Sequence, residues 1–218
     1  MKIIHLEKPN SLNDLEAERK IVLSQHLEIE FKNLLIESEF DQLCNAFGIT
    51  PNDFFLQENH YFDTETFALK NLHSALRIRE KDGSYEMTLK QPSGQELLET
   101  NQIISKDEAA TAFQSGKLPG GPIEAIIKQY GISFSDLSYF GSLKTERAEI
   151  NFRQGLLVLD HSYYLNFEDF ELEYEVENYE AGLKIFSELL KEHVIPMRIT
   201  NNKIQRFYER KSSLQEDS

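Results

Sequence analysis

The chain has a single cysteine and lacks the signals of export and of membrane insertion. Cys44 alone cannot form an internal disulfide, and its helical spacing with Phe40, Leu43 and Phe47 predicts a buried thiol rather than a reactive one. No stretch approaches the roughly 20 apolar residues of a transmembrane helix. The N-terminus has no apolar signal-peptide core either. These absences favour a cytoplasmic protein that does not bind a membrane.

Several widespread catalytic and nucleotide-binding motifs are also missing. The sequence contains no phosphate-binding P-loop, no G-x-S-x-G nucleophile elbow and no dinucleotide fingerprint. The six histidines do not show the spacing of a compact zinc site. Gly120 and Gly121 stand between two prolines, so they break the chain and do not form a nucleotide loop.

Positive charge is scarce in this sequence. There are 23 Lys and Arg residues against 37 Asp and Glu, which gives a formal net charge of −14. Such a chain repels nucleic-acid backbones and anionic membranes. If it binds an anionic ligand, it needs focused basic groups, divalent cations, or both.

The sequence is rich in strands that alternate between apolar and polar residues. Leu27, Ile29 and Phe31 share one face of the first strand, and the residues between them are polar. We predict strands over 26–34, 54–64, 75–81, 85–91, 97–104, 140–152, 156–165 and 167–177. Asp82-Gly83 predicts a tight hairpin between the third and fourth of these. Eight strands in hairpin order favour an α+β fold, an eight-stranded antiparallel β-barrel with peripheral helices.

Helices are predicted between the hairpins. The first covers 37–47 and ends at Gly48; a second begins with a capping box of Ser105 and Glu108; a third runs from Pro122 to about Gly131. A fourth is amphipathic and begins near Tyr179. We assign 25–211 to one domain and expect a disordered tail over 212–218. Residues 1–24 form an extension of unknown role, either a loose segment or the product of a start codon placed too far upstream.

The polar faces of the predicted strands carry charges of both signs. They hold Glu28, Glu30 and Lys32; Arg77 and Arg79; Glu86, Thr88 and Lys90; Arg147 and Glu149; Asp160; and Glu171, Glu173 and Glu175. For any single strand a solvated face is the simpler interpretation: the two arginines could pair with Glu86, and Asp160 could lie at a surface turn. If the barrel closes with these faces inward, carboxylates would bind divalent cations and basic groups would bind phosphate oxygens. The combination indicates a metal–polyphosphate site.

The same motifs, in this order, resemble the CYTH superfamily of triphosphate tunnel metalloenzymes, in its uncharacterised branch of low-GC Gram-positive bacteria. The resemblance runs from about Gln25 to Arg206. It is carried by Glu28-x-Glu30-x-Lys32, Tyr61-Phe62-Asp63-Thr64, Arg77-x-Arg79, Thr88-Leu89-Lys90, Thr145-x-Arg147, Leu159-Asp160 and Glu171-x-Glu173-x-Glu175. The N-terminal extension and a long insert around 105–135 depart from the short bacterial tripolyphosphatases.

The resemblance implies a tunnel that binds a triphosphate together with Mg²⁺ or Mn²⁺. It implies that the metal ligands are Glu28, Glu30, Asp160, Glu171 and Glu173. It implies that the phosphates are bound by Lys32, Arg77, Arg79, Lys90, Arg147, Lys203 and Arg206. Tyr61 and Lys32 are the implied catalytic pair that assists attack by water. Cationic neighbours would lower the pKa of this lysine, and Glu28 and Glu30 would raise it.

We therefore expect a metal-dependent triphosphatase that acts on a small-molecule triphosphate. Inorganic triphosphate ranks first, and thiamine or nucleoside triphosphate follows. One alternative is a class IV-type adenylate cyclase that forms cyclic AMP from ATP in the same tunnel. Another is a non-catalytic binder or sensor of polyphosphate or of a phosphorylated nucleotide. We expect a monomer or a homodimer, with no nucleic acid and no membrane as partner.

Overall fold

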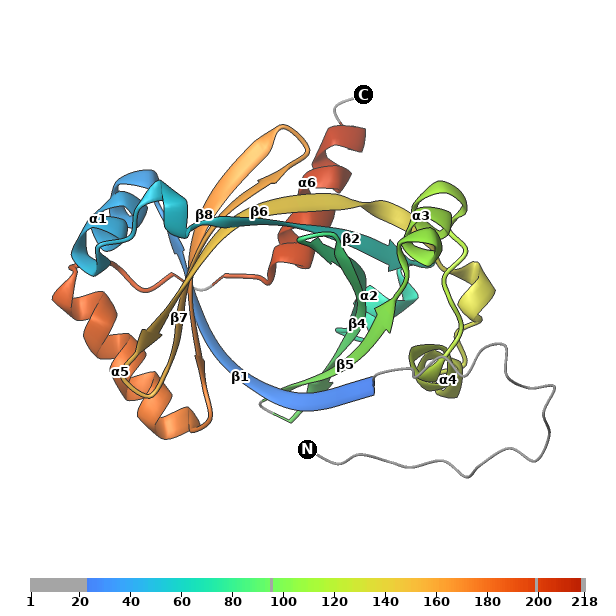
Figure 1. Cartoon of the computed structure of the whole chain (residues 1–218), viewed down its shortest axis with the longest axis horizontal. Coiled ribbons are helices and arrows are strands. Elements are labelled where there is room, and N and C mark those ends of the chain that lie inside the picture. Colours follow the sequence, from blue (N-terminus) through green and yellow to red (C-terminus); the bar gives the residue numbers. More distant parts are fainter. Residues whose placement is uncertain (1–22, 95, 199, 217–218) are drawn as a thin grey trace.

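The computed structural model describes residues 23–94, 96–198 and 200–216 (Figure 1). Its strands are β1 (Leu23–Leu35), β2 (Phe55–Asp63), β3 (Ala75–Lys81), β4 (Ser84–Ser93), β5 (Glu96–Ile104), β6 (Ser138–Phe152), β7 (Gly155–Tyr164) and β8 (Phe167–Val176). Its α-helices are α1 (Glu37–Phe47), α2 (Ala68–Asn71), α3 (Lys106–Ser115), α4 (Pro122–Gln129), α5 (Tyr179–Glu192) and α6 (Lys203–Glu216). Residues 1–22 of the expected extension lie outside the described residues, and Leu23 and Ser24 belong to β1.

The strands form one closed antiparallel barrel in the order β1-β5-β4-β3-β2-β6-β7-β8. The first strand closes it, because β1 pairs through 23–28 with β5 and through 29–35 with β8. This confirms the predicted eight-stranded antiparallel barrel. In the closed order, β1 and β2 lie diametrically opposite each other, four strands apart in either direction.

The local signals in the sequence act where they were expected. Asp82 and Gly83 both have positive φ, 51° and 74°, as the primed turn of a two-residue hairpin requires. Gly48 ends α1 in the left-handed conformation, at φ 68°. The Ser105 hydroxyl accepts the Glu108 backbone N–H and completes the capping box of α3.

Most of the hydrophobic core lies outside the barrel, between the strands and the helices. On one side α3 and α4 pack Ala109, Ala112, Ile123 and Ile127 against Leu76, Ile78 and Met87 of β3 and β4. On the other side α1 and α5 pack Phe40, Leu43, Phe186 and Leu189 against Leu157, Leu159 and Leu172 of β7 and β8. Figure 1 shows these two helix pairs on opposite sides of the barrel. The helices thus bury the apolar faces of the strands and leave the polar faces pointing inward.

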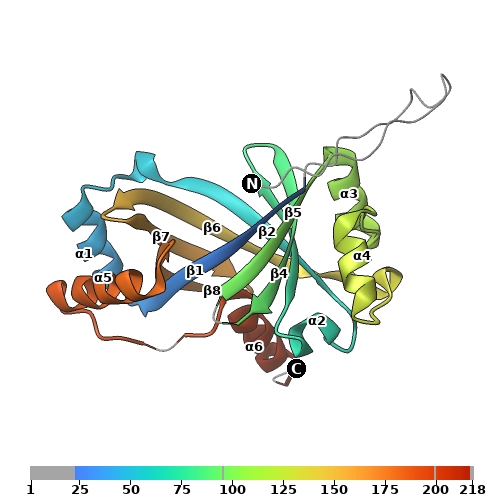
Figure 2. The same cartoon turned by 90° about the horizontal axis from the view of Figure 1, so that it is seen from below.

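Two helices were not predicted, the short α2 and the longer α6. Helix α6 lies with α2 at one end of the barrel (Figure 2). Its Phe207 is buried with Tyr61, Leu143 and Tyr164. Gly141 permits this approach, because a Cβ there would stand 2.6 Å from the Phe207 ring.

The disordered tail predicted from Ser212 is wrong as far as Glu216, because α6 continues through it. The segment after Lys203 contains neither Gly nor Pro, so nothing in the sequence ends the helix early. None of the described helices is both long and apolar enough to cross a membrane.

Candidate functional site

The barrel encloses a cavity of about 330 Å³ that collects most of the predicted site residues. Those that line it are Glu28, Glu30, Lys32, Tyr61, Arg77, Arg79, Lys90, Arg147, Glu173 and Lys203. Asp160, Glu171 and Arg206 are not among the lining residues. Asp160 contacts the lining Arg147, Glu171 contacts the lining Lys203, and Arg206 contacts Asp169 and Glu171. The polar side chains point inward because side chains alternate between the two faces of a strand and the helices cover the apolar faces.

On the wall formed by β6, β7 and β8, every cation has a carboxylate partner. Arg147 donates through Nε to Asp160 Oδ1 at 2.7 Å and through Nη2 to Asp160 Oδ2 at 2.6 Å. The same Nη2 donates to Glu173 Oε2 at 2.8 Å. Asp160 is fully buried, with 0% of its surface exposed. This is the planar, two-point pairing that a guanidinium group favours.

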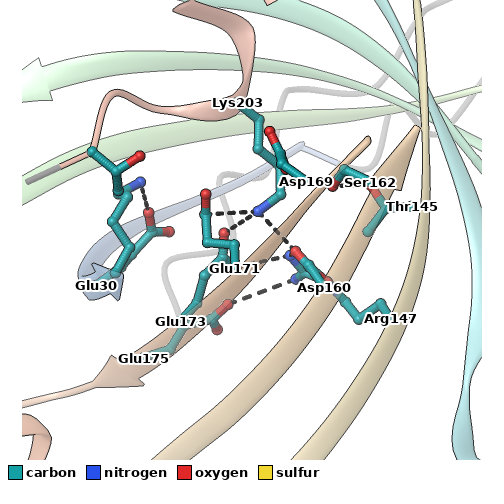
Figure 3. A network of polar contacts seen from close by, with 12 residues as sticks. Glu30, Thr145, Arg147, Asp160, Ser162, Asp169, Glu171, Glu173, Glu175 and Lys203 are labelled. Atoms are coloured by element: carbon teal, nitrogen blue, oxygen red, sulfur yellow. Dashed lines mark hydrogen bonds and ion pairs between the residues drawn. The ribbon is translucent and has the colours of Figure 1, made fainter. Parts of the chain in front are cut away.

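Helix α6 adds two more cations to this wall. Lys203 Nζ lies 2.8 Å from Asp160 Oδ2, donates to Glu171 Oε1 at 2.8 Å, and also contacts Glu173 (Figure 3). Arg206 donates to Asp169 Oδ2 at 2.9 Å and pairs with Glu171. The wall therefore depends on a helix far away in the sequence.

The pKa values of Glu171 and Glu173 move in opposite directions. Burial and the neighbouring Glu173 raise the pKa of Glu171 to about 7, against the effect of Lys203. Burial also opposes ionisation of Glu173, but Lys203 and Arg147 outweigh it and hold the pKa of that carboxyl well below its ordinary value. In this pair Glu173 is the carboxylate that stays ionised.

On the wall formed by β2 to β5, the arginines have little compensation. Arg79 Nε donates to the neutral Asn59 Oδ1 at 3.0 Å. Among the described residues the carboxylate near Arg77 is Glu99, 3.9 Å away, and the buried Arg77 Nε has no hydrogen-bond partner. Burial, Arg77 and Arg147 together lower the pKa of Arg79 to about 9. Two crowded guanidinium groups without a bound carboxylate would be stabilised by an anion.

Besides Lys203, the lining contains Lys32 and Lys90, and both are paired. Lys90 donates to Glu28 Oε2 at 2.7 Å and contacts Glu99, and Lys32 contacts Glu30. Burial acts to lower the pKa of Lys32, but Glu30, Glu173 and Glu171 outweigh it, so the pKa is raised. Of the two opposing influences expected on this lysine, the carboxylates prevail.

Tyr61 and Lys32 line the same cavity from opposite walls, since β2 lies across the barrel from β1. No hydrogen bond joins the two side chains among the described residues. The Tyr61 ring instead packs near Phe207 of α6, with 6.2 Å between the ring centroids.

The carboxylates at the junction of β1 and β8 have the chemistry of a divalent-cation site. Glu30 and Glu175 are direct cross-strand partners, an arrangement that is unfavourable for two like charges unless a cation lies near. Burial and Glu28 raise the pKa of Glu175 to about 7, and burial raises that of Glu28. Within the described part of the chain, no three His, Cys, Asp or Glu side chains are already gathered as a metal site. The oxygen donors fit Mg²⁺ or Mn²⁺ in kind.

Several lining residues were missed by the sequence interpretation, among them Gln57, Asn59, Glu99 and Asn101. Burial opposes ionisation of Glu99, yet Lys90 and Arg77 outweigh it and lower its pKa to about 2. Both faces of β5 carry polar residues, since Gln102 on the outer face donates to the Gly120 carbonyl. Alternation alone therefore did not show which face of β5 points inward. The available signal for Glu99 was positive charge at Lys90 on the adjacent strand β4 and at Arg77 on β3 beyond it.

Comparison with known proteins gives one consistent family. The model of the CYTH domain family matches residues 26–208. A Bacillus subtilis (strain 168) protein named "Putative triphosphatase YjbK" is 48% identical over 189 residues, which cover 87% of this chain and 98% of that protein.

Two solved structures share the architecture. A Bacillus halodurans crystal structure, described as "a putative adenylate cyclase", is 46% identical, covers 84% of this chain and 98% of its own, and superimposes with a TM-score of 0.82. HpAC1 of Hippeastrum, described as an adenylyl cyclase with a dominant triphosphatase activity, is 22% identical, covers 84% and 95%, and has a TM-score of 0.69. The latter likeness concerns the fold alone. From the family match and the close Bacillus relatives, this chain belongs to the CYTH domain family.

Proposed function

We propose that this protein hydrolyses a small triphosphate inside the barrel with the help of a divalent cation, and that inorganic triphosphate is its preferred substrate. The observation that carries the proposal is the pair Arg77 and Arg79, two buried guanidinium groups on the cavity wall with no carboxylate in hydrogen-bonding distance among the described residues. A polyanion would supply the missing compensation. The name of the Bacillus subtilis relative, which is 48% identical, supports the same reaction.

The size of the cavity favours a small ligand. Its volume of about 330 Å³ is at the low end of the roughly 300–1,000 Å³ of small-molecule pockets. Few of its lining residues are aliphatic, namely Ala75, Leu97 and Ile204. A compact and highly charged triphosphate suits such a lining better than a large organic group does.

Glu28, Glu30 and Glu175 would hold the divalent cation. When bound, Mg²⁺ or Mn²⁺ would neutralise charge on the phosphate oxygens. Asp160, Glu171 and Glu173, which the family resemblance adds to the ligand set, already contact Arg147 and Lys203. We therefore give Asp160 and Glu171 a supporting role, in which they hold these two cations at the cavity wall.

The basic side chains of the cavity would orient the phosphates and stabilise the charge that develops during transfer to water. Arg77, Arg79 and Lys90 would act from one wall, and Lys32, Arg147 and Lys203 from the other. Phosphoryl transfer depends on such positioning and electrostatic stabilisation and needs little covalent help. Lys32 and Tyr61 face the substrate volume from opposite sides, where they would move protons at the attacking water.

A phosphate-release screen tests this proposal. Purified protein would be incubated with inorganic triphosphate, pyrophosphate, thiamine triphosphate and nucleoside triphosphates, each with Mg²⁺, with Mn²⁺ and with neither. We expect metal-dependent release that is fastest with inorganic triphosphate. Tight binding of triphosphate without release of phosphate under any condition would indicate a binding protein and not an enzyme.

Cyclisation of ATP is the second candidate, because the Bacillus halodurans relative is named for it. The internal 3′-hydroxyl would take the place of water as the nucleophile. Product analysis after incubation with ATP and Mg²⁺ separates the two reactions. Cyclic AMP with pyrophosphate indicates the cyclase, and ADP with phosphate indicates the hydrolase.

A further inference from the structure

Four neighbouring strands place one residue each in a continuous row across the cavity wall. Tyr61 of β2 is the direct partner of Arg77 on β3, Arg77 that of Thr88 on β4, and Thr88 that of Asn101 on β5. Direct partners in an antiparallel sheet point to the same face. Tyr61, Arg77 and Asn101 line the cavity, and Thr88 stands between the lining residues of β4. The row therefore faces the interior along its whole length.

Three successive members of this row have a buried polar atom without a partner. Arg77 Nε, Thr88 Oγ1 and Asn101 Oδ1 make no hydrogen bond to any described residue. Thr88 is 0% exposed and Asn101 7% exposed. Buried polar groups are nearly always hydrogen-bonded, and leaving one unpaired is destabilising. Three such atoms side by side indicate a surface built for a ligand.

We propose that Thr88 and Asn101 are further substrate-binding residues, which with Arg77 form a three-point contact for the phosphoryl oxygens of a short polyphosphate. The Thr88 hydroxyl and the Asn101 carboxamide N–H would donate to oxygens that Arg77 attracts by charge. The unpaired Asn101 Oδ1 is an acceptor, so the carboxamide would rotate to turn its N–H towards an anionic oxygen. This inference rests on the proposed function and extends it to two uncharged residues that no charge pattern could reveal.

Neutral donors solve a problem that charged ones would create on this wall. Burial and the neighbouring Arg77 already lower the pKa of Arg79. Another cation at the position of Thr88 or Asn101 would add to this repulsion. A hydroxyl and a carboxamide add directional contacts at no electrostatic cost.

Thr88→Val separates ligand binding from a structural role. The change replaces one hydroxyl by a methyl group of similar size. Because Thr88 Oγ1 has no protein partner, we expect the melting temperature of the ligand-free protein to stay equal or to rise. We expect the affinity for inorganic triphosphate, measured by calorimetry in EDTA, to fall about tenfold. Asn101→Leu should give a loss of the same order.

Thr145→Val is the matched control. Thr145 is equally buried and points inward, and like Thr88 it is not itself among the lining residues, but its hydroxyl is 3.3 Å from Ser162 Oγ and so has a protein partner. This variant should lose stability and keep its affinity for triphosphate. Thr88→Ser should restore most of the affinity, and a comparison of Thr88→Ser with Thr88→Ala serves in place of the valine variant if that variant does not fold.

The salt dependence of binding gives a second readout. Loss of a neutral contact should weaken binding by the same factor at low and high KCl, whereas Arg77→Met should flatten the dependence of log Kd on log salt. Wild-type affinity in both Thr88→Val and Asn101→Leu would overturn the inference and leave the proposed function standing. A wild-type protein that neither binds nor cleaves triphosphate would instead reject the proposed function itself.

Discussion

The two walls of the cavity differ in how their arginines are compensated. On the β6–β8 wall Arg147, Lys203 and Arg206 are each held by carboxylates. On the β2–β5 wall Arg77 and Arg79 have no such partner in hydrogen-bonding distance among the described residues. On the first wall, carboxylates already balance the positive charges in the free protein. The second wall lacks that compensation, so an anionic ligand would contact it most strongly.

The scaffold can hold the second wall because its outer face is strongly apolar. Leu76 and Ile78 alternate with the arginines along β3, and Met87 is the direct partner of Ile78 on β4. Each of the three is at most 1% exposed. Burying one such side chain contributes about 1.5–3 kcal/mol. The strands are thus fixed from outside, and the charges inside do not need to stabilise them.

Removing the central cation of the first wall should have the largest effect on folding. Arg147→Met removes the two-point partner of buried Asp160 and leaves Lys203 as the remaining basic contact of Asp160 and Glu173 among the described residues, so we expect the free energy of unfolding to fall by about 3–5 kcal/mol. Urea denaturation measures it. The matched variant Arg77→Met should change it by less than about 1 kcal/mol, and equal losses in the two would erase the distinction between the walls.

Catalytic activity, in contrast to stability, should depend strongly on Arg77. Arg77→Met removes a phosphate contact that strengthens in the transition state, so kcat should fall and KM should rise. We expect a loss of about 10²–10³-fold in kcat/KM for inorganic triphosphate, with the fold intact. Steady-state phosphate release measures this. Unchanged kinetics would remove Arg77 from the site.

Glu99, a carboxylate of the second wall, should make stability depend on pH. The pKa of Glu99 lies at about 2, below its ordinary 4.5. A lowered carboxyl pKa stabilises the fold above pH 4.5, and this contribution is lost as the pH falls from about 5 towards 2. The lost contribution amounts to about 3 kcal/mol. Glu99→Gln should lower stability at pH 7 and flatten the acid limb of a stability–pH curve; a parallel limb in the variant would contradict the assignment.

The smallest expected effect concerns the metal. Glu28→Gln removes one proposed ligand and should raise the Mg²⁺ concentration needed for half-maximal activity by about tenfold. Glu86→Gln removes the same charge from the same cavity but lies on β4, away from the β1–β8 junction. A Mg²⁺ titration in which both variants shift equally would indicate a general charge effect and no ligand role.

The barrel was predictable because the alternation of apolar and polar residues along a strand indicates which of its faces is buried. Alternation in β1, the Asp82-Gly83 turn and the Gly48 helix end are local features, and local physics sets all three. The family resemblance then implied that the polar faces of the strands point into the barrel. The helix α6 could not be found in this way, because its apolar residues Ile204, Phe207 and Tyr208 pack against distant strands and are too few for a clear helical stripe.

The candidate site was predicted in composition but not in its pairing. Sequence motifs named Arg77 and Arg147 as equals, and the partner that distinguishes them, Asp160, is decided by the register between β6 and β7. Glu99 and Asn101 were missed because β5 is polar on both faces. The pairing of the site residues depends on contacts between strands that are far apart in the chain, and these contacts cannot be read from a single sequence.

The anchoring of Lys203 and Arg206 makes the charge on one side of the cavity depend on the docking of α6. If this helix undocks, Asp160 and Glu173 keep Arg147 as a basic contact, whereas Glu171 loses both of its basic contacts among the described residues. Undocking would therefore leave that side more negative and would repel a polyphosphate. The competence of the cavity is thus coupled to the docking of a helix that follows all eight described strands in the chain.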